Sequence, residues 1–290
     1  MLQMVKRILP VILSIALYSC NSLDLKGIFI PTGDSVEKRF VQSMDMNENL
    51  KAETLYADYG YSFYVAADPH INETCNNLYK FNCELKNDGD ALFGAILGDC
   101  TDIRDNFPLY FDALMYDPHR HSFNQRIFHI LGNHDMFFNE WTVFRESAGA
   151  SVYWFEVICP DGKDLFISLD TATGTLGRKQ TEWFRTFLAE NRKSYRHCVV
   201  LTHTNFFYTD TSQDSSGNMP IEESFSLIDF LGKQKVSLVL QGHDHYREET
   251  TYNNVRYTVL GAISDKMEAP EYLKVNVDKN GVHLEWHTEL

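Results

Sequence analysis

The stretch Ile127-Phe128-His129-Ile130-Leu131-Gly132-Asn133-His134-Asp135 carries the strongest structural signal in this chain of 290 residues. Its first five residues are mainly apolar, which is typical of a buried β-strand. The polar quartet Gly132 to Asp135 follows directly. Since α/β folds build their sites at the carboxyl ends of strands, the stretch predicts a strand with a functional loop at its end.

Four further segments repeat this arrangement. Each follows an aliphatic or β-branched run and contains aspartate or histidine; they are Asp68-Pro69-His70, Gly98-Asp99, His203 and Gly242-His243-Asp244-His245. Isolated histidines are usually structural, but side chains at the ends of separate strands can converge on one point. The pattern therefore predicts a metal site that is assembled from five strand ends.

Apolar strands alternate with helical patterns from Tyr61 onward, which indicates an α/β fold. The spacing of aromatic and aliphatic residues predicts helices over 105–116, 179–191 and 224–231. Turns at Pro160-Asp161-Gly162 and Asn280-Gly281 predict two β-hairpins. We expect two stacked mixed β-sheets flanked by helices, because parallel and antiparallel strands must be accommodated together.

The first residues predict an export signal. Lys6 and Arg7 precede the mainly apolar run Ile8 to Leu17, which is too short to span a membrane. Leu17-Tyr18-Ser19-Cys20 is similar to a bacterial lipoprotein signal, in which the cysteine is lipidated; an ordinary secretory signal is the alternative. We expect a signal peptide at 1–19, a lipidated tether with an edge strand at 20–59, and the main domain at 60–290. The expected location is the bacterial cell envelope, either periplasmic or surface-exposed, with the membrane as a partner through Cys20.

Five cysteines follow Cys20. Cys75 and Cys83 are close enough in sequence to close a small loop outside the cytoplasm, and the sequence alone leaves their pairing open. Cys100 and Cys198 lie beside or within apolar strands, so we expect them to be buried thiols.

The side-chain types at the five strand ends favour two divalent metal ions. Oxygen and imidazole ligands without cysteine suit Zn, Mn or Fe. Seven candidate ligands are too many for one tetrahedral ion and suitable for two; they are Asp68, His70, Asp99, Asn133, His203, His243 and His245. Two ions about 3.5–4 Å apart need a bridging ligand, for which the carboxylate of Asp99 is suited, and such a pair can hold a hydroxide nucleophile.

The charge balance favours a phosphate substrate. The formal net charge of −14 argues against a surface for nucleic acid, and an anionic substrate would need positive charge at the site itself. Two divalent ions bring four positive charges, while Asp68 and Asp99 are the only carboxylates among the candidate ligands, so about two positive charges remain before hydroxide binds. A phosphate ester would therefore be attracted to the site.

The five segments, in the order D-x-H, G-D, G-N-H-D, H and G-H-x-H, resemble the motifs of the calcineurin-like metallophosphoesterase superfamily. The resemblance implies a two-sheet α/β sandwich, so that 60–290 would be a metallophosphoesterase domain. It also implies two metal sites that share Asp99: one formed by Asp68, His70, Asp99 and His245, the other by Asp99, Asn133, His203 and His243. By the same resemblance, His134 would protonate the leaving oxygen and Asp102 would orient His134.

The predicted function is hydrolysis of a small phosphate ester by two metal ions. The motifs do not separate a phosphodiesterase from a phosphomonoesterase. A non-catalytic binding protein or scaffold on the same fold is the alternative, because a fold does not determine a function. The presence of His134 argues against a scaffold, since a scaffold has no need of a general acid.

Overall fold

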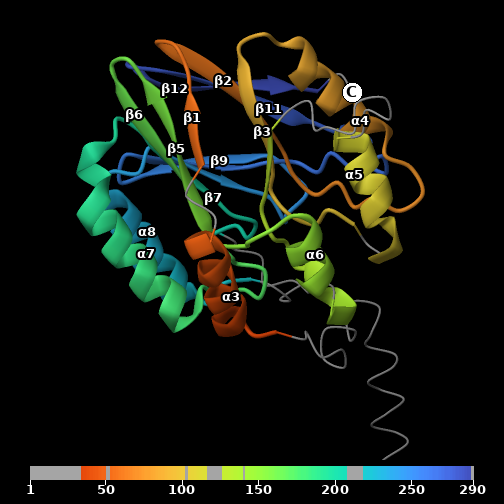
Figure 1. Ribbon diagram of the computed structural model, residues 1–290, viewed down its shortest axis with the longest axis horizontal. Coiled ribbons are helices and arrows are strands. Elements are labelled where there is room, and N and C mark those ends of the chain that lie inside the picture. Colours follow the sequence, from red (N-terminus) through yellow and green to blue (C-terminus); the bar gives the residue numbers. More distant parts are fainter. Residues whose placement is uncertain are drawn as a thin grey trace, which may run out of the picture.

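The computed structural model describes residues 34–49, 53–101, 104–115, 126–139, 141–207 and 218–288. Two mixed β-sheets are stacked on each other and flanked by helices (Figure 1), which confirms the expected fold class. The α-helices of the described residues are α3 (Val36–Asn49), α4 (Asn76–Asn87), α5 (Phe107–Met115), α6 (Trp141–Ser147), α7 (Gly177–Asn191) and α8 (Ile221–Lys233). Short 3₁₀ helices are η1 (Arg104–Asn106), η2 (His134–Asn139) and η3 (Arg192–Ser194). None of these helices is long and apolar enough to cross a lipid bilayer.

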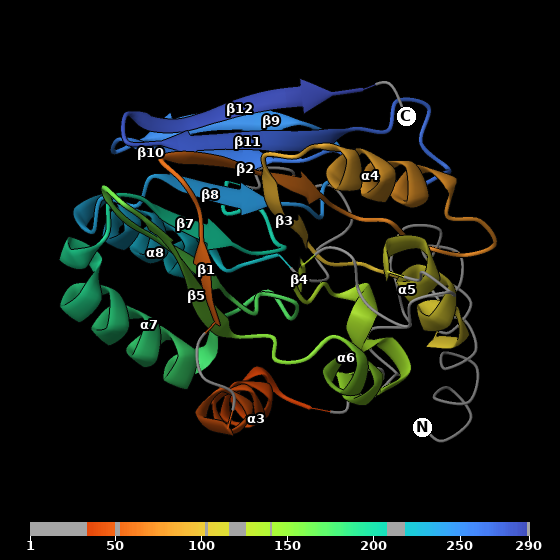
Figure 2. The same cartoon turned by 45° about the horizontal axis from the view of Figure 1, so that its top comes forward.

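The larger sheet has seven strands in the order β1-β5-β6-β7-β8-β10-β9. Their bounds are β1 (Glu53–Tyr56), β5 (Tyr153–Cys159), β6 (Gly162–Ser168), β7 (Cys198–Leu201), β8 (Leu238–Gln241), β9 (Glu248–Tyr252) and β10 (Val255–Val259). The smaller sheet has the order β12-β11-β2-β3-β4, with β2 (Gly60–Ala66), β3 (Ala91–Ile96), β4 (Ile127–His129), β11 (Tyr272–Asp278) and β12 (Gly281–His287). Strands β2, β3 and β4 are parallel, as are β6, β7 and β8. The arrows of β2, β7 and β8 point toward the same edge of the stack (Figure 2).

Aromatic side chains fill the space between the two sheets. The ring of Phe93 stacks on Phe63 at 4.8 Å and meets Phe155 and Phe166 edge-on at 5.3 and 5.2 Å. All four side chains are completely buried. Full burial of a phenylalanine side chain contributes about 1.5–3 kcal/mol to the stability of the fold, so this cluster stabilises the packing of the two sheets against each other.

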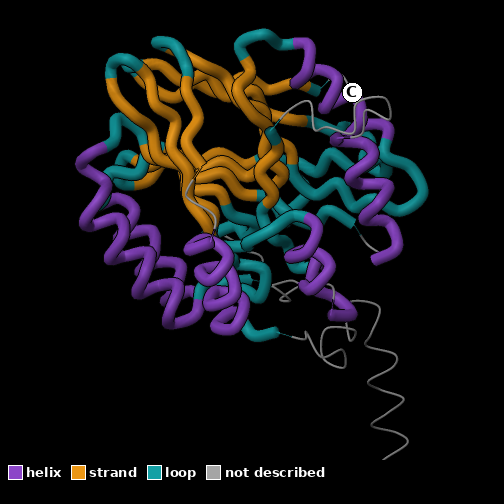
Figure 3. The backbone as a smooth tube through the Cα atoms, viewed as in Figure 1, coloured by secondary structure: helices purple, strands orange, loops and turns teal. Residues whose placement is uncertain are grey.

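Helices cover part of the outer face of each sheet (Figure 3). Helices α7 and α8 place Phe184 and Leu231 in one hydrophobic cluster with the strands of the larger sheet. Helices α4 and α5 place Phe81 and Tyr110 in a cluster with Tyr64 of the smaller sheet. The strands that lead to the site are therefore covered on both faces, as expected for parallel strands.

Most elements predicted from the sequence are confirmed. Helices α5, α7 and α8 correspond to the predicted helices, and both hairpins are antiparallel pairs, β5 with β6 and β11 with β12. Cys100 and Cys198 are buried thiols as expected, and Cys75 and Cys83 are free thiols in the structure.

The expected tether over 20–59 needs correction. Helix α3 occupies Val36–Asn49, and β1 pairs with β5 in the larger sheet, so the folded unit begins well before residue 60. The helix was missed because its buried side includes the polar residues Arg39 and Ser43, which hide the helical period of apolar residues. The predicted signal peptide, Cys20 and the predicted strand at 27–30 lie outside the described residues.

Candidate metal centre

The five strand-end segments converge where the carboxyl ends of strands from both sheets meet. A first group of potential ligands consists of Asp68, His70, Asp99 and His245. Each residue offers one ligand atom, and these four atoms all lie within 4.8 Å of one another. A second group meets the same limit and consists of Asp99, His203 and His243. Asp99 belongs to both groups, so its carboxylate lies between two clusters of potential ligands.

Asn133 adds a fourth ligand atom to the second group. Its Oδ1 lies 2.9 Å from Nε2 of His203 and 3.0 Å from Nδ1 of His243. Oδ2 of Asp99 is 3.4 Å from Nε2 of His203. All seven side chains that the sequence singled out as candidate ligands are thus brought together.

The first group has the chemistry of a cation site. Nε2 of His70 and Nε2 of His245 are 2.9 Å apart, and Oδ2 of Asp99 lies 3.6 Å from Nε2 of His70. Oδ1 of Asp68 is 3.6 Å from Nε2 of His245. Neutral imidazole nitrogens that meet this closely need a shared proton or a cation between their lone pairs. Nitrogen and carboxylate donors around one point fit a divalent metal ion.

The backbone of these loops is held in an unusual conformation. Five site residues have positive φ angles: Asp68 (53°), His70 (45°), Asp99 (52°), His243 (77°) and His245 (59°). They are five of the eight such non-glycine residues in the described part of the chain. Each costs about 1–3 kcal/mol and persists only where the surroundings enforce it. Such a concentration of strain at one point is typical of a functional site.

Two glycines of the motifs are required by close packing. A β-carbon on Gly132 would overlap the backbone nitrogen and the carboxylate of Asp99. A β-carbon on Gly242 would lie 2.6 Å from Oδ2 of Asp68 and 3.0 Å from Cβ of Ala67. The glycines therefore let neighbouring loops approach closely enough for their ligand atoms to meet.

Hydrogen bonds orient the candidate ligands. Nδ1 of His203 donates to the carbonyl oxygen of Leu97 at 2.7 Å, which turns Nε2 toward Asn133 and Asp99. The backbone N–H of His243 donates to Oδ2 of Asp68 at 3.0 Å. Supporting contacts of this kind fix the tautomer and the direction of a metal-binding histidine.

Asp135 positions two loops of the site, a role that the sequence did not reveal. Its side chain is completely buried, and its two oxygens accept the backbone N–H groups of Cys100 at 2.8 Å and Gly132 at 2.9 Å. It thereby joins the loop of Asp99 to the loop of Asn133. Its place in the G-N-H-D motif was a signal, but a contact to backbone groups elsewhere in the chain cannot be read from a motif.

The surroundings of Asp99 and His203 favour the charged forms of both side chains. Burial opposes ionisation of Asp99, but His203, His134 and His70 together outweigh it and hold the pKa of Asp99 well below its usual range. Burial likewise opposes charge on His203, but Asp99, Asp68 and the carbonyl of Leu97 together outweigh it and raise the pKa of His203 to about 10. Burial raises the pKa of Asp68 to about 7, and burial together with His203 lowers the pKa of His243 to about 3. Protons held here would be displaced by metal ions.

His134 lies beside the first ligand group, against the ring of His70. Its ring is 4.7 Å from that of His70 and nearly perpendicular to it, at 87°. Its backbone N–H donates to Oδ1 of Asp99 at 2.8 Å, and its side chain is 32% exposed, whereas that of Asp99 is 2% exposed. The imidazole is thus accessible to a bound molecule. Asp102, the predicted partner of His134, lies outside the described residues.

Solved structures share this fold at low sequence identity. GAP50 of Plasmodium, described as the anchor in the inner membrane complex, has a TM-score of 0.59 and 14% identity, covering 79% of this chain and 84% of that one. Purple acid phosphatase PPD1 from yellow lupin has a TM-score of 0.59 and 13% identity, with 80% and 52% covered. A proposed 5′-nucleotidase from Staphylococcus aureus has a TM-score of 0.50 and 16% identity, with 79% and 53% covered, so about half of the lupin and staphylococcal proteins is matched. At these identities the similarity shows the fold.

The amino-acid sequence itself matches a known protein family. No curated protein matches it. The family model described as calcineurin-like phosphoesterase matches residues 61–247, a range that contains all seven candidate ligands and His134. Since that range is well over half of the chain, the protein belongs to the calcineurin-like phosphoesterase family.

Proposed function

We propose that this protein hydrolyses small phosphate esters with the help of two divalent metal ions, which Mn, Fe or Zn would provide. The observation that carries the proposal is the pair of four-ligand groups that share Asp99. Asp68, His70 and His245 would complete one site, and Asn133, His203 and His243 the other. When bound, two such ions activate a water molecule and neutralise the charge of the phosphate.

The role proposed for His134 is that of a general acid. A general acid must reach the leaving oxygen, and His134 is more exposed than the buried side chains of Asp68, Asp99 and His203. An imidazole exchanges protons near neutral pH, which suits protonation of an alkoxide leaving group. Asp102 would orient this imidazole.

The proposed setting is the bacterial cell envelope. The apolar run Ile8 to Leu17, followed closely by Cys20, supports a lipid anchor at this cysteine. Fractionation of cells checks this part: the protein should be found with the membranes and be released by detergent. Recovery in the soluble fraction would contradict anchoring.

The structural similarity to GAP50 of Plasmodium gives weight to a second candidate, a non-catalytic scaffold. A scaffold needs neither complete ligand groups nor an accessible histidine beside them. The two candidates differ in one property that can be measured, which is turnover of phosphate esters when metal is bound.

The test compares His134→Ala with the wild type in the presence of Mn²⁺, using 4-nitrophenyl phosphate and bis(4-nitrophenyl) phosphate as monoester and diester substrates. Turnover should fall by roughly 10²–10⁴-fold while both metal ions are retained, because the general acid is lost and the ligands are not. His283→Ala, which alters an exposed histidine of β12, is the matched control and should keep full activity. Unchanged turnover in His134→Ala would refute the assigned role, and no turnover by metal-loaded wild type would favour the scaffold.

A further inference from the structure

Helix α3 contains an arginine that is completely buried and lies outside the residues matched by the family model. Nε and Nη2 of Arg39 donate to the two carboxylate oxygens of Asp170 at 2.8 and 2.9 Å. Both side chains are 0% exposed. Because desolvation of two charges offsets much of their attraction, such a pair is weak evidence for stability, and another role has to be considered.

Asp170 leads directly to the metal centre through Thr171. The hydroxyl groups of Thr171 and Thr202 are hydrogen-bonded at 2.8 Å. The backbone N–H of Thr204 donates to Oγ1 of Thr171 at 3.0 Å, and Oγ1 of Thr204 donates to the carbonyl oxygen of Thr171 at 3.0 Å. Thr202 and Thr204 are the two neighbours of His203, so Thr171 holds the loop of this candidate ligand from both sides.

The loop of Asp170 is itself held on several sides. The hydroxyl of Ser151 donates to Oδ2 of Asp170 at 2.9 Å, and the side chain of Gln180 exchanges hydrogen bonds with the backbone N–H and carbonyl of Asp170, each 2.9 Å long. Arg39 also donates to the hydroxyl of Thr173 at 3.3 Å. Arg39 is therefore the part of α3 that directly fixes the segment 170–173.

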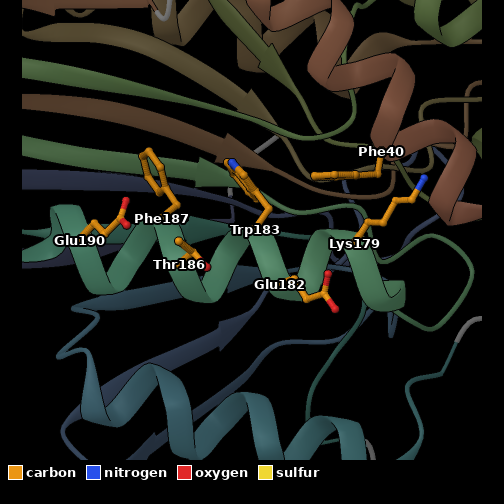
Figure 4. A pocket seen from close by; sticks show the side chains of 7 residues that line it. All are labelled: Phe40, Lys179, Glu182, Trp183, Thr186, Phe187 and Glu190. Carbon is orange, nitrogen blue, oxygen red and sulfur yellow. The ribbon is translucent and has the colours of Figure 1, made fainter.

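The apolar contact between α3 and α7 leaves an open groove. The ring centroids of Phe40 and Trp183 are 6.0 Å apart, and beside them lies a groove of about 450 Å³ that Phe187 and Lys179 also line (Figure 4). Apolar packing on this side of α3 is thus incomplete. Polar contacts also join α3 to its neighbours, and the completely buried ion pair of Arg39 and Asp170 is one of them.

We propose that Arg39 is a positioning residue of the metal centre: it fixes Asp170, and through Thr171 it fixes the loop that aims His203 at the second metal ion. The proposal rests on the proposed function, since it assumes that His203 binds metal. It predicts a selective effect. Loss of Arg39 should weaken the ion held by Asn133, His203 and His243 and spare the ion held by Asp68, His70 and His245.

The test titrates Mn²⁺ into the metal-free protein and follows the two binding steps by calorimetry. His203→Ala identifies the step that belongs to the second group. Arg39→Met should weaken that step about 10-fold, the lower end of the effect usual for residues that support metal ligands. The other step should stay within about two-fold of the wild type, and turnover of Arg39→Met should recover when Mn²⁺ is raised, which a general loss of structure would not allow.

Asn47→Ala is the matched control, because Asn47 also lies on α3 and donates to the carbonyl oxygen of Val152 at 2.8 Å without contacting Asp170. It should leave both steps unchanged. Thr171→Val breaks the next link and should weaken the same step as Arg39→Met, so it replaces that variant if Arg39→Met does not fold.

Three results would overturn the proposal. Wild-type affinity in Arg39→Met, or in Thr171→Val where that variant replaces it, refutes the link to His203. Equal weakening of both steps, or the same loss in Asn47→Ala, shows that α3 stabilises the fold and does not position one ligand. Wild-type protein that binds no Mn²⁺ refutes the proposed function and the role of Arg39 together, which separates that failure from the first two.

Discussion

His129 shows how a histidine of the interior differs from the histidines of the metal centre. Nδ1 of His129 and the hydroxyl of Tyr110 are hydrogen-bonded at 2.7 Å, and burial, together with Arg126, lowers the pKa of His129 to about 4. The unfolded chain therefore binds a proton at this site more readily than the folded protein. The resulting stability is present above the unfolded pKa of about 6.5 and is lost as the pH falls toward 4.

The lowered pKa of His129 gives a prediction for how the stability of the protein depends on pH. His129→Gln removes the titrating group and keeps an amide that can bond to Tyr110. Between pH 7 and 4.5 the free energy of unfolding of the wild type should fall by about 2 kcal/mol relative to His129→Gln, since one pKa unit corresponds to 1.36 kcal/mol. Urea unfolding at several pH values measures this difference. If the free energy of unfolding changed with pH in the same way in both proteins, His129 would not be a buried neutral histidine.

At the scale of single residues, the sequence predicted which side chains come together, but not which contacts orient them. Histidine, aspartate and asparagine at strand ends can be recognised in the sequence as candidate ligands, because their side chains carry the donor atoms that metal ions require. The carbonyl oxygen of Leu97, which orients His203, belongs to the backbone and leaves no mark in the sequence. The ion pair of Arg39 and Asp170 joins residues 131 positions apart, and no local pattern links them.

At the scale of elements, the central strands hold the two sheets together through aromatic contacts. Phe93 of β3 touches rings from both sheets, Phe63 on one side and Phe155 and Phe166 on the other. Phe93→Ala should lower the free energy of unfolding by about 3–5 kcal/mol, because it removes a buried ring and leaves a cavity.

The matched control for this change is Phe225→Ala. Phe225 is 61% exposed on α8, and its replacement should change the free energy of unfolding by no more than about 0.5 kcal/mol. Denaturant unfolding of both variants provides the measurement. Similar values for the two would contradict a core between the sheets that depends on Phe93.

The elements predicted correctly are those whose pattern reflects simple burial. Helix α7 shows an apolar stripe, and the β11–β12 hairpin turns at Asn280-Gly281, so local chemistry specifies both. Helix α3 could not be predicted in this way, since it buries Arg39 and Ser43 among polar partners. The partners of these two side chains, Asp170 and Ser151, are brought near only by the tertiary fold.

At the scale of the whole molecule, the candidate metal centre lies where strands of the two sheets meet. The smaller sheet leads to Asp68, Asp99 and Asn133, and the larger sheet leads to His203 and His243. Metal ions bound there would connect the sheets at one edge, while the aromatic core connects them in the middle. Ions present at 100 times their dissociation constant would add about 2.7 kcal/mol of stability per site.

The acidic surface and the proposed metal ions would act on a phosphate ester in opposite ways. A net charge of −14 would repel phosphate esters from most of the molecule. Two divalent ions would supply positive charge where the four-ligand groups meet at Asp99. Activity should therefore depend on metal occupancy more than on any surface residue.

The most direct test of the two-metal account is the rate of hydrolysis of bis(4-nitrophenyl) phosphate and 4-nitrophenyl phosphate as Mn²⁺ is added stepwise to the metal-free protein. At least one ester should be hydrolysed, and the rate should reach its plateau at two equivalents, because both four-ligand groups must be filled. Asp99→Asn should lose metal occupancy and activity together, since Asp99 belongs to both groups. A plateau at one equivalent, or two bound ions without hydrolysis of either ester, would contradict it.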